Sequence, residues 1–314
     1  EDMYGSGMID PRKSAQGYAM KQALEAVTGI KDPSSWLITR DLAYPFAVTV
    51  RPAWGRDHAR ELLWGASSYV LFMSGTLGDP NLLATKLNVD RSSVEYIDVP
   101  SHFPVANRMV YYWPVVAVSR KSDAHDYNRL ASAINFIATQ PALRNKKGIV
   151  HTGSFSIARE LYQRLSAVDP HRYITHYASN TGATAGGMDF LTALTAFEYS
   201  SVPVVLISPS MTHGVDLPHV IGWQVIAKVP FANLGDPVVK VRRETSLPDD
   251  KSFGRKVYDE DAINLVVQAA GRAVRTPTDT GVTYVLDANF YPLYKRTYAP
   301  LYFKEAFHWL KNRL

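Results

Sequence analysis

The chain has 314 residues, of which 46% are hydrophobic and 20% are charged, as in a folded globular protein. Its 34 basic and 29 acidic residues give a formal charge of +5, which permits an anionic partner without requiring one. Cysteine is absent, which excludes disulfides, thiolate zinc sites and cysteine-ligated iron–sulfur clusters within these residues. No apolar run has the length of a membrane span, and no histidine pair has the spacing of a helical zinc site. We therefore expect a cytoplasmic protein, without a membrane contact or a metal site of its own.

Short segments rich in β-branched and aromatic residues predict buried strands. In chain order these segments are residues 36–41, 46–50, 68–73, 108–113, 147–152, 202–208, 223–229 and 281–287. Helical spacing of apolar residues is found between the later strands, at residues 124–140, 154–166, 187–199 and 258–275. Strands that alternate with helices in this way predict an α/β fold, with a parallel sheet covered by helices on both faces.

A domain boundary is predicted near residues 98–106, because VPSHFPVAN has two prolines and no periodicity. The part from about residue 107 onward has enough strands for a complete sheet. The first hundred residues have only three strand candidates, which make a poor independent core. We therefore expect these residues to be the end of a larger domain.

Polar loops follow three of the predicted strands, where parallel sheets bind ligands. The loops are SGTLGDP (74–80), GSFSIARELYQRL (153–165) and PSMTHGVDLPHV (209–220). The segment QAAGRAVR (268–275) lies instead in the last predicted helix, where positions i, i+4 and i+7 place Gln268, Arg272 and Arg275 on one face. Two guanidiniums on one face suit an anion such as a phosphate, which arginine binds with two hydrogen bonds. The alternative is a solvated basic face near a helix C-terminus.

Taken together, SGTLGDP, HTGSF, HGVDLPHVIGWQVIAKVPFANLGDP and QAAGRAVRTPTDTGVTYVLDANF resemble the C-terminal half of superfamily 2 helicases, specifically the XPD/DinG group. The resemblance extends from about Trp36 to the C-terminus and is most specific over residues 202–290. Residues typical of this group are Pro230, Phe231, Asp236, Pro237, Asp279, Gly281, Asp287 and Phe290. The resemblance implies a RecA-like second motor domain over residues 101–314. Residues 1–100 would be the tail of the first motor domain, with room for a piece of an inserted domain.

By this resemblance the four segments are motifs III, IV, V and VI, and their residues have expected roles. The catalytic arginine fingers at the γ-phosphate of ATP would be Arg272 and Arg275. The other ATP-site residues would be Gln268, Gly271, Gly214 and Asp216. The DNA contacts would come from Ser154, Phe155, Thr152 and Thr212. Coupling between the ATP site and the interdomain cleft would use Ser74, Gly75 and Thr76.

Three of these assignments have alternatives or departures. Ser154 also suits the N-cap of the following helix. Thr76 also suits a simple loop hydroxyl. Thr212 and His213 stand where many relatives have glutamate before the motif V glycine, so the electrostatics there must differ.

The chain has no G-x-x-x-x-G-K-[ST] loop and no D-E-A-H box. ATP and Mg²⁺ are therefore expected to be bound mainly by a first motor domain upstream, and these residues alone are expected to lack ATPase activity. The family's iron–sulfur cysteines would also lie upstream, so the question of a cluster stays open.

The expected function is that of the C-terminal motor half of an ATP-dependent 5′→3′ DNA helicase. Its partners would be single-stranded DNA, forked duplex DNA and the rest of its own polypeptide, in a monomeric protein of the bacterial or phage cytoplasm. One alternative is a non-catalytic nucleic-acid-binding module that retains the helicase fold. Another is a nucleotide-binding α/β enzyme unrelated to helicases, which the missing phosphate-binding loop disfavours.

Overall fold

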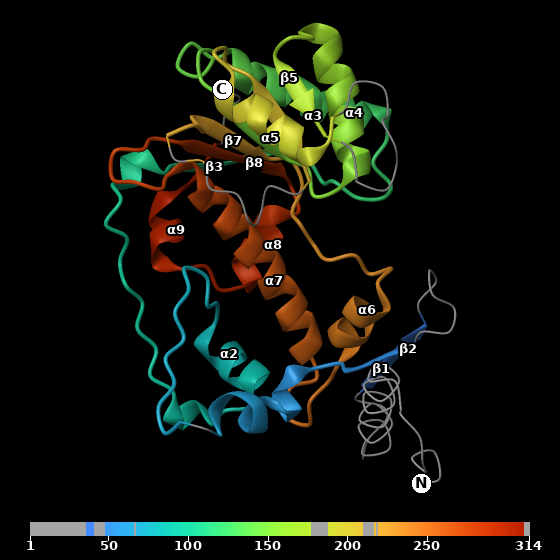
Figure 1. Cartoon of the computed structure of the whole chain (residues 1–314), viewed down its shortest axis with the longest axis vertical. Coiled ribbons are helices and arrows are strands. Elements are labelled where there is room, and N and C mark those ends of the chain that lie inside the picture. Colours follow the sequence, from blue (N-terminus) through green and yellow to red (C-terminus); the bar gives the residue numbers. More distant parts are fainter. Residues whose placement is uncertain are drawn as a thin grey trace, which may run out of the picture. The chain divides into compact units, whose positions relative to one another are not determined.

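The computed structural model describes residues 36–40, 48–65, 67–176, 188–209, 217 and 219–310, which fall into two compact units on either side of Gly65 (Figure 1). In the first unit, strand β1 (Trp36–Arg40) pairs antiparallel with β2 (Val48–Pro52). Two short helical turns follow, η3 (Gly55–Asp57) and η4 (Arg60–Trp64). Both strands of this hairpin were predicted from the sequence. The predicted boundary near residues 98–106, between the tail of a first motor domain and the second motor domain, stays a prediction.

The second unit is built on a seven-stranded sheet in which every neighbouring pair of strands is parallel. Its spatial order is β5 (Tyr173–Thr175), β6 (Val205–Ser208), β4 (Gly148–His151), β7 (Trp223–Ile226), β8 (Val282–Asp287), β3 (Val110–Val116) and β9 (Phe307–Trp309). β4, β6 and β7 are buried along their whole length, as their continuous apolar sequences predict. The predicted α/β class with a RecA-like parallel sheet is confirmed.

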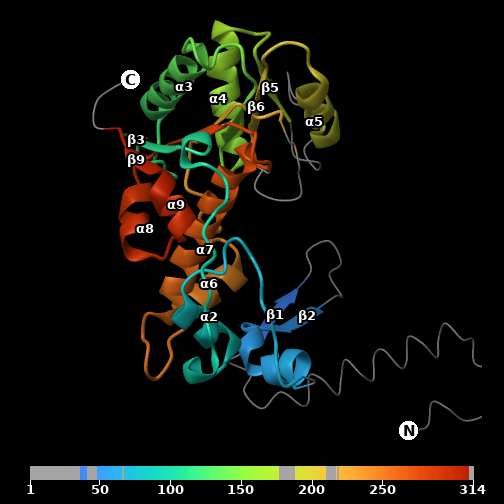
Figure 2. The ribbon, with the colours of Figure 1, turned by 90° about the vertical axis from the view of Figure 1, so that its left-hand side faces the viewer.

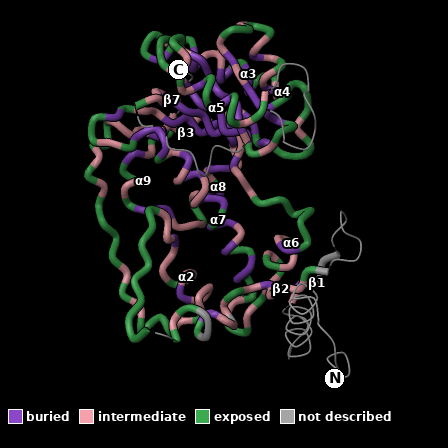
Figure 3. Tube along the Cα trace, in the orientation of Figure 1, coloured by how far each residue is buried: buried purple, intermediate pink, exposed green. Residues whose placement is uncertain are grey.

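Helices cover both faces of this sheet (Figure 2). On one face, α3 (Ala124–Thr139) and α4 (Phe155–Val168) pack on Val150, Val225 and Leu286. The opposite face is covered by α5 (Phe190–Tyr199) over β4 and β6, and by α7 (Phe253–Ala270), α8 (Phe290–Arg296) and α9 (Leu301–Ala306) over β7, β8 and β3. Figure 3 shows that the buried residues gather in the strands and along the sides of the helices that meet them.

Two further helices pack against α7 rather than on the sheet. They are α2 (Pro80–Leu87) and α6 (Pro237–Glu244), and each begins with a proline behind an aspartate cap. The remaining one-turn helices are η5 (Arg91–Ser93), η6 (Val105–Asn107) and η7 (Gly271–Ala273).

The predicted strand at residues 68–73 is wrong. The segment forms no ladder with any described strand, and its apolar side chains are exposed: Tyr69 is 93% and Met73 is 83% exposed. A strand exists only where a neighbouring strand forms a ladder of hydrogen bonds with it, and residues 68–73 form none with a described strand. Apolar composition alone therefore predicted a strand that this segment does not form.

Candidate functional site

The segment with the two candidate arginines is not a continuous helix. α7 ends at Ala270, the next three residues form the 3₁₀ turn η7, and Val274 is extended (φ −132°, ψ 109°). The helical spacing that would place Gln268, Arg272 and Arg275 on one face therefore stops too early, and the predicted shared face is wrong. Arg272 is only 8% exposed, whereas Arg275 and Gly271 are exposed.

The loop of residues 74–76 is bound directly to the helical layer. Gln268 Nε2 on α7 donates a 2.8 Å hydrogen bond to Thr76 Oγ1, although the two residues are 192 positions apart. Tyr302 on α9 donates its hydroxyl proton to the Gly75 carbonyl at 2.8 Å. The Thr76 N–H donates to Ser74 Oγ at 3.1 Å, which closes the loop on itself. The structure thus brings the predicted coupling residues against the helix that leads to the arginines.

Three polar side chains form a row across the middle of the sheet, on the face that carries α5 and α7. They are His151 on β4, Gln224 on β7 and Thr283 on β8, and all three are buried. Gln224 Oε1 lies 3.1 Å from His151 Nε2, and Gln224 Nε2 lies 2.9 Å from Thr283 Oγ1. The same nitrogen donates to the carbonyls of Ala269 (2.8 Å) and Ala270 (2.9 Å), the last two residues of α7. The row therefore joins the sheet to the end of the helix that precedes Arg272.

His151 is held in its neutral form. Burial, and to a smaller extent the charge of Arg272, lower the pKa of its imidazole to about 4, against the hydrogen bond that its Nε2 donates to Gln224 Oε1, which raises it. A neutral ring beside Arg272 leaves that guanidinium without a competing positive charge. Sequence reasoning treated His151 as an ordinary histidine and did not single out Gln224.

The segment after Arg272 is shaped by Asp279. Its Oδ2 accepts hydrogen bonds from the backbone N–H groups of Arg275 (2.7 Å) and Thr276 (2.8 Å), and its Oδ1 lies 2.5 Å from His219 Nδ1. Burial raises the pKa of Asp279, but the two backbone hydrogen bonds, the interaction with His219 and the side chain of Thr276 together outweigh burial, and the pKa lies below its ordinary value. The carboxylate is thus charged at neutral pH and holds the backbone from which the Arg275 side chain extends.

Gly281 and Asp287, which are typical of the XPD/DinG group, have structural roles in this fold. A Cβ at Gly281 would collide with Ala273, so only glycine lets the chain pass behind η7. Asp287 ends β8 and accepts N–H groups from Val229 (2.8 Å), Asn289 (3.0 Å) and Val118 (3.2 Å). This one buried carboxylate therefore joins the carboxyl ends of β7, β8 and β3.

Phe290, Phe231 and Asp236 are also explained. Phe290 is fully buried and contacts Tyr112 at 5.5 Å between ring centroids. Phe231 stacks on Tyr258 of α7 at 5.5 Å, and Asp236 caps α6 through the Val238 N–H at 2.8 Å. These residues build the domain and position α7; none of them contributes a group to the arginine segment itself.

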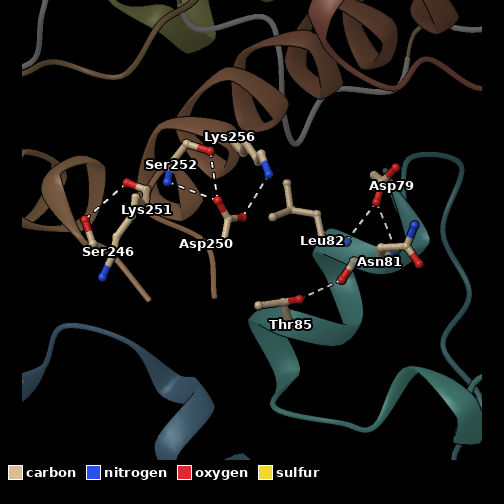
Figure 4. A network of polar contacts seen from close by, with 9 residues as sticks. All are labelled: Asp79, Asn81, Leu82, Thr85, Ser246, Asp250, Lys251, Ser252 and Lys256. Carbon is tan, nitrogen blue, oxygen red and sulfur yellow. Dashed lines mark hydrogen bonds and ion pairs between the residues drawn. The ribbon is translucent and has the colours of Figure 1, made fainter. Parts of the chain in front are cut away.

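The beginnings of α2 and α7 are each held by a short polar network (Figure 4). Asp79 caps α2 by accepting hydrogen bonds from the backbone N–H groups of Asn81 (2.9 Å) and Leu82 (2.8 Å). Asp250 accepts a hydrogen bond from Lys256 Nζ (2.9 Å) in the first turns of α7. Both helices thus begin at fixed points, and the start of α2 directly follows the loop of residues 74–79.

A buried carboxyl group connects these two helices. Glu260 on α7 is 2% exposed, and its Oε1 accepts the Asp79 N–H at 2.5 Å. Lys86 Nζ lies 4.0 Å from Oε2. Burial raises the pKa of Glu260 from 4.5 to about 7, against the lowering effects of the Asp79 N–H and Lys86. Sequence reasoning did not identify this residue.

Glu260→Gln is expected to make the chain more stable at alkaline pH. The raised pKa means that the folded state holds the proton more tightly, so this contribution is complete below pH 4.5 and is lost as the pH rises through about 7. The shift corresponds to up to about 3 kcal/mol, of which about 2–3 kcal/mol falls between pH 5 and 8. Urea unfolding of both proteins across this range should show the variant gaining on the wild type by that amount. A difference that stays constant with pH would contradict this assignment.

The loop after β4 holds the predicted DNA contacts. Ser154 Oγ accepts the Ile157 N–H at 3.4 Å and caps α4, so the capping alternative is confirmed. Thr152 is fully buried and donates its hydroxyl to the Ser154 carbonyl at 3.0 Å, which gives it a loop-shaping role rather than a surface contact. Phe155 is 40% exposed and lies edge-on to His176 at 5.5 Å. The structure therefore presents Ser154 and Phe155, but not Thr152, at the surface.

Some predicted site residues lie outside the described part of the chain: Thr212, Gly214 and Asp216. The described residues contain no group of three or more histidine, aspartate or glutamate side chains arranged to hold a metal ion. Among the same residues, no helix combines the length and apolarity that crossing a bilayer requires.

A family model described as the helicase C-terminal domain matches residues 138–301. The chain belongs to this family. The match spans the row of polar side chains, the end of α7 and the arginine segment. These residues of the chain therefore form a helicase motor domain. A search of curated proteins finds no match.

Solved structures support the same fold. Those titled "XPD_Helicase" and "XPD_APO" match with TM-scores of 0.58 and 0.56 at 17% and 16% identity, over 94% of this chain in both cases. The structure titled "Structure of S. tokodaii Xpd4" matches with a TM-score of 0.50 at 16% identity, also over 94% of this chain. These matches cover 50%, 57% and 58% of the respective structures, so the chain spans little more than half their length. They agree with the predicted XPD-like fold.

Proposed function

We propose that this chain is the C-terminal motor half of an ATP-dependent DNA helicase of the XPD/DinG type, which moves 5′→3′ on single-stranded DNA and opens forked duplexes as a monomer. The observation that carries the proposal is the hydrogen bond from Gln268 to Thr76. It joins two helicase-like segments from distant parts of the sequence at the helix that leads to Arg272 and Arg275. The alternative, a solvated basic face at the end of a helix, would not predict this contact.

In this proposal ATP and Mg²⁺ are bound mainly by a first motor domain, and this half completes the site. In support of the second part, the arginine segment offers the guanidiniums of Arg272 and Arg275 for a phosphate. Bound ATP would supply the γ-phosphoryl group whose transfer to water drives movement. Arg275, exposed on a backbone held by Asp279, and Arg272, whose charge acts on His151, would stabilise the charge that develops on that group.

The same half would hold the DNA through contacts that do not read sequence. Ser154 lies at the N-terminus of α4, where a backbone phosphate is favoured, and the exposed ring of Phe155 suits stacking on a base. Residues 74–76 would pass the state of the nucleotide site to the cleft between the motor domains. Opening and closing of that cleft would produce each step.

Phe155→Ala is expected to weaken binding of this chain to a fluorescent single-stranded oligonucleotide by about tenfold, since a stacked base contributes about 1–3 kcal/mol. The matched control is Tyr199→Ala, which removes an exposed aromatic ring (76% exposed) from the far end of α5. Fluorescence anisotropy at several salt concentrations should show weak binding that falls with added salt, an effect of Phe155 and none of Tyr199. Equal affinities for both variants would contradict the DNA assignment.

The chain alone is expected to hydrolyse no ATP, because it lacks the phosphate-binding loop. Robust DNA-stimulated hydrolysis by these residues would show that the ATP site is misplaced. A full-length protein that binds DNA but does not hydrolyse ATP would favour the non-catalytic binding module instead.

A further inference from the structure

A side chain from the sheet is bonded to the last carbonyls of α7, just before the two arginines. The last four carbonyls of any α-helix have no partner within the helix. Here two of them, at Ala269 and Ala270, accept hydrogen bonds from the side chain of Gln224. Gln224 is fully buried in β7, between β4 and β8, so the donor is anchored in the middle of the sheet.

The orientation of this amide is fixed by its partners. Carbonyl oxygens only accept, so the amide nitrogen of Gln224 must face the helix and its oxygen must face His151. His151 Nε2 must then carry the proton that it donates to Gln224 Oε1. The result is one hydrogen-bonded chain, from the helix carbonyls through Gln224 to a neutral His151, with the charge of Arg272 close enough to act on the ring.

The end of the helix decides where Arg272 points. Only Gly271 separates Ala270 from Arg272, and the backbone changes there from α-helix to the 3₁₀ turn of η7. A charged group that stabilises a transition state must be held to within about 0.5 Å of its working position. A helix end that frays by one residue would move Arg272 by far more.

We infer that Gln224 is a positioning residue for Arg272, which holds the end of α7 so that this arginine meets the γ-phosphate; the inference rests on the proposed function. Gln224 touches neither nucleotide nor DNA in this account. It acts through the carbonyls of residues 269 and 270. Gln224 thus supports the proposed ATP site from inside the sheet, through these two carbonyls alone.

The test uses the full-length helicase and its single-stranded-DNA-stimulated ATPase activity. Gln224→Met keeps the length of the side chain but removes the amide, and we expect kcat to fall by at least about tenfold with KM for ATP within about threefold of wild type. Gln224→Asn keeps an amide that is too short to reach the carbonyls, and it should show the same pattern if the methionine variant folds poorly. Thr283→Val is the matched control: it removes a neighbour of Gln224 in the same row but leaves both helix carbonyls bonded, and its kcat should match wild type.

Combination with Arg272→Ala separates this inference from the proposed function. Because Gln224 acts through Arg272, Gln224→Met should lower kcat no further in the Arg272→Ala background. If Arg272→Ala turns over like wild type, the proposed function fails. If Arg272→Ala is inactive while the folded Gln224 variants turn over like wild type, the proposed function stands and the positioning role is overturned. If the fold-decreases in kcat caused by Gln224→Met and Arg272→Ala multiply in the double variant, the positioning role is also overturned.

Discussion

Arg275→Ala in the full-length protein is expected to lower kcat for DNA-stimulated ATP hydrolysis by about 10³–10⁵-fold, the contribution typical of an arginine finger. The side chain is exposed, and Asp279 holds the backbone of this residue through its N–H, a contact that alanine keeps. The thermal melt of the variant should therefore match wild type. Arg275→Lys should not restore turnover, because an ammonium group cannot reproduce the planar fork of guanidinium.

Arg272→Ala should cause a loss of the same order, but with a cost in stability. Its side chain is 8% exposed, and a buried guanidinium cannot be removed without leaving space and unpaired neighbours. ATPase kcat must therefore be read beside a thermal melt, at a temperature where the variant is folded. Near wild-type turnover in both alanine variants would mean that neither arginine acts in ATP hydrolysis, and the proposed role of this half at the ATP site would fail.

Asp287→Ala is expected to destabilise the chain by about 3–5 kcal/mol, the largest stability effect that the described contacts predict. The carboxylate is 1% exposed and accepts backbone N–H groups at the ends of three strands. Alanine would leave these donors buried without a partner. Burial raises the pKa of Asp287, against the hydrogen bonds from Val229 and Asn289, which lower it.

Asp236→Ala is the matched control for this change. Asp236 also accepts a backbone N–H, from Val238 at the start of α6, but it is exposed, so its loss should cost only about 1 kcal/mol. Urea unfolding of the two variants and the wild type measures both costs. If Asp287→Ala costs no more than Asp236→Ala, the carboxylate is not the junction of the three strands.

The main strands were predictable because burial on both faces of a parallel sheet demands continuous apolar sequence, as in VLI of β6. β5 and β9 were missed because three residues carry no periodicity. Residues 68–73 have the composition of a strand, but pairing is a property of two segments, and composition describes only one.

The end of α7 could not be predicted for a similar reason. Helical spacing continues through QAAGRAVR, yet the helix stops at Ala270. There its last carbonyls are bonded by Gln224, which lies on β7, 45 residues before Ala269. A signal was present, since a single glutamine inside the apolar strand WQVI must be hydrogen-bonded if buried. Its partner was not visible, because only the fold brings the two segments together. Glu260 likewise acquires its raised pKa only when α2 packs on α7.

Binding of ADP–aluminium fluoride, an analogue of the phosphoryl-transfer transition state, tests most directly whether this half supplies the charge that completes the ATP site. An arginine finger stabilises the transition state more than the ground state. With Mg²⁺ and single-stranded DNA present, the full-length wild type should bind the analogue far more tightly than ADP alone. Arg275→Ala should lose that preference while its affinity for ADP stays within about twofold of wild type. An Arg275→Ala protein that binds the analogue as tightly as wild type would contradict the account.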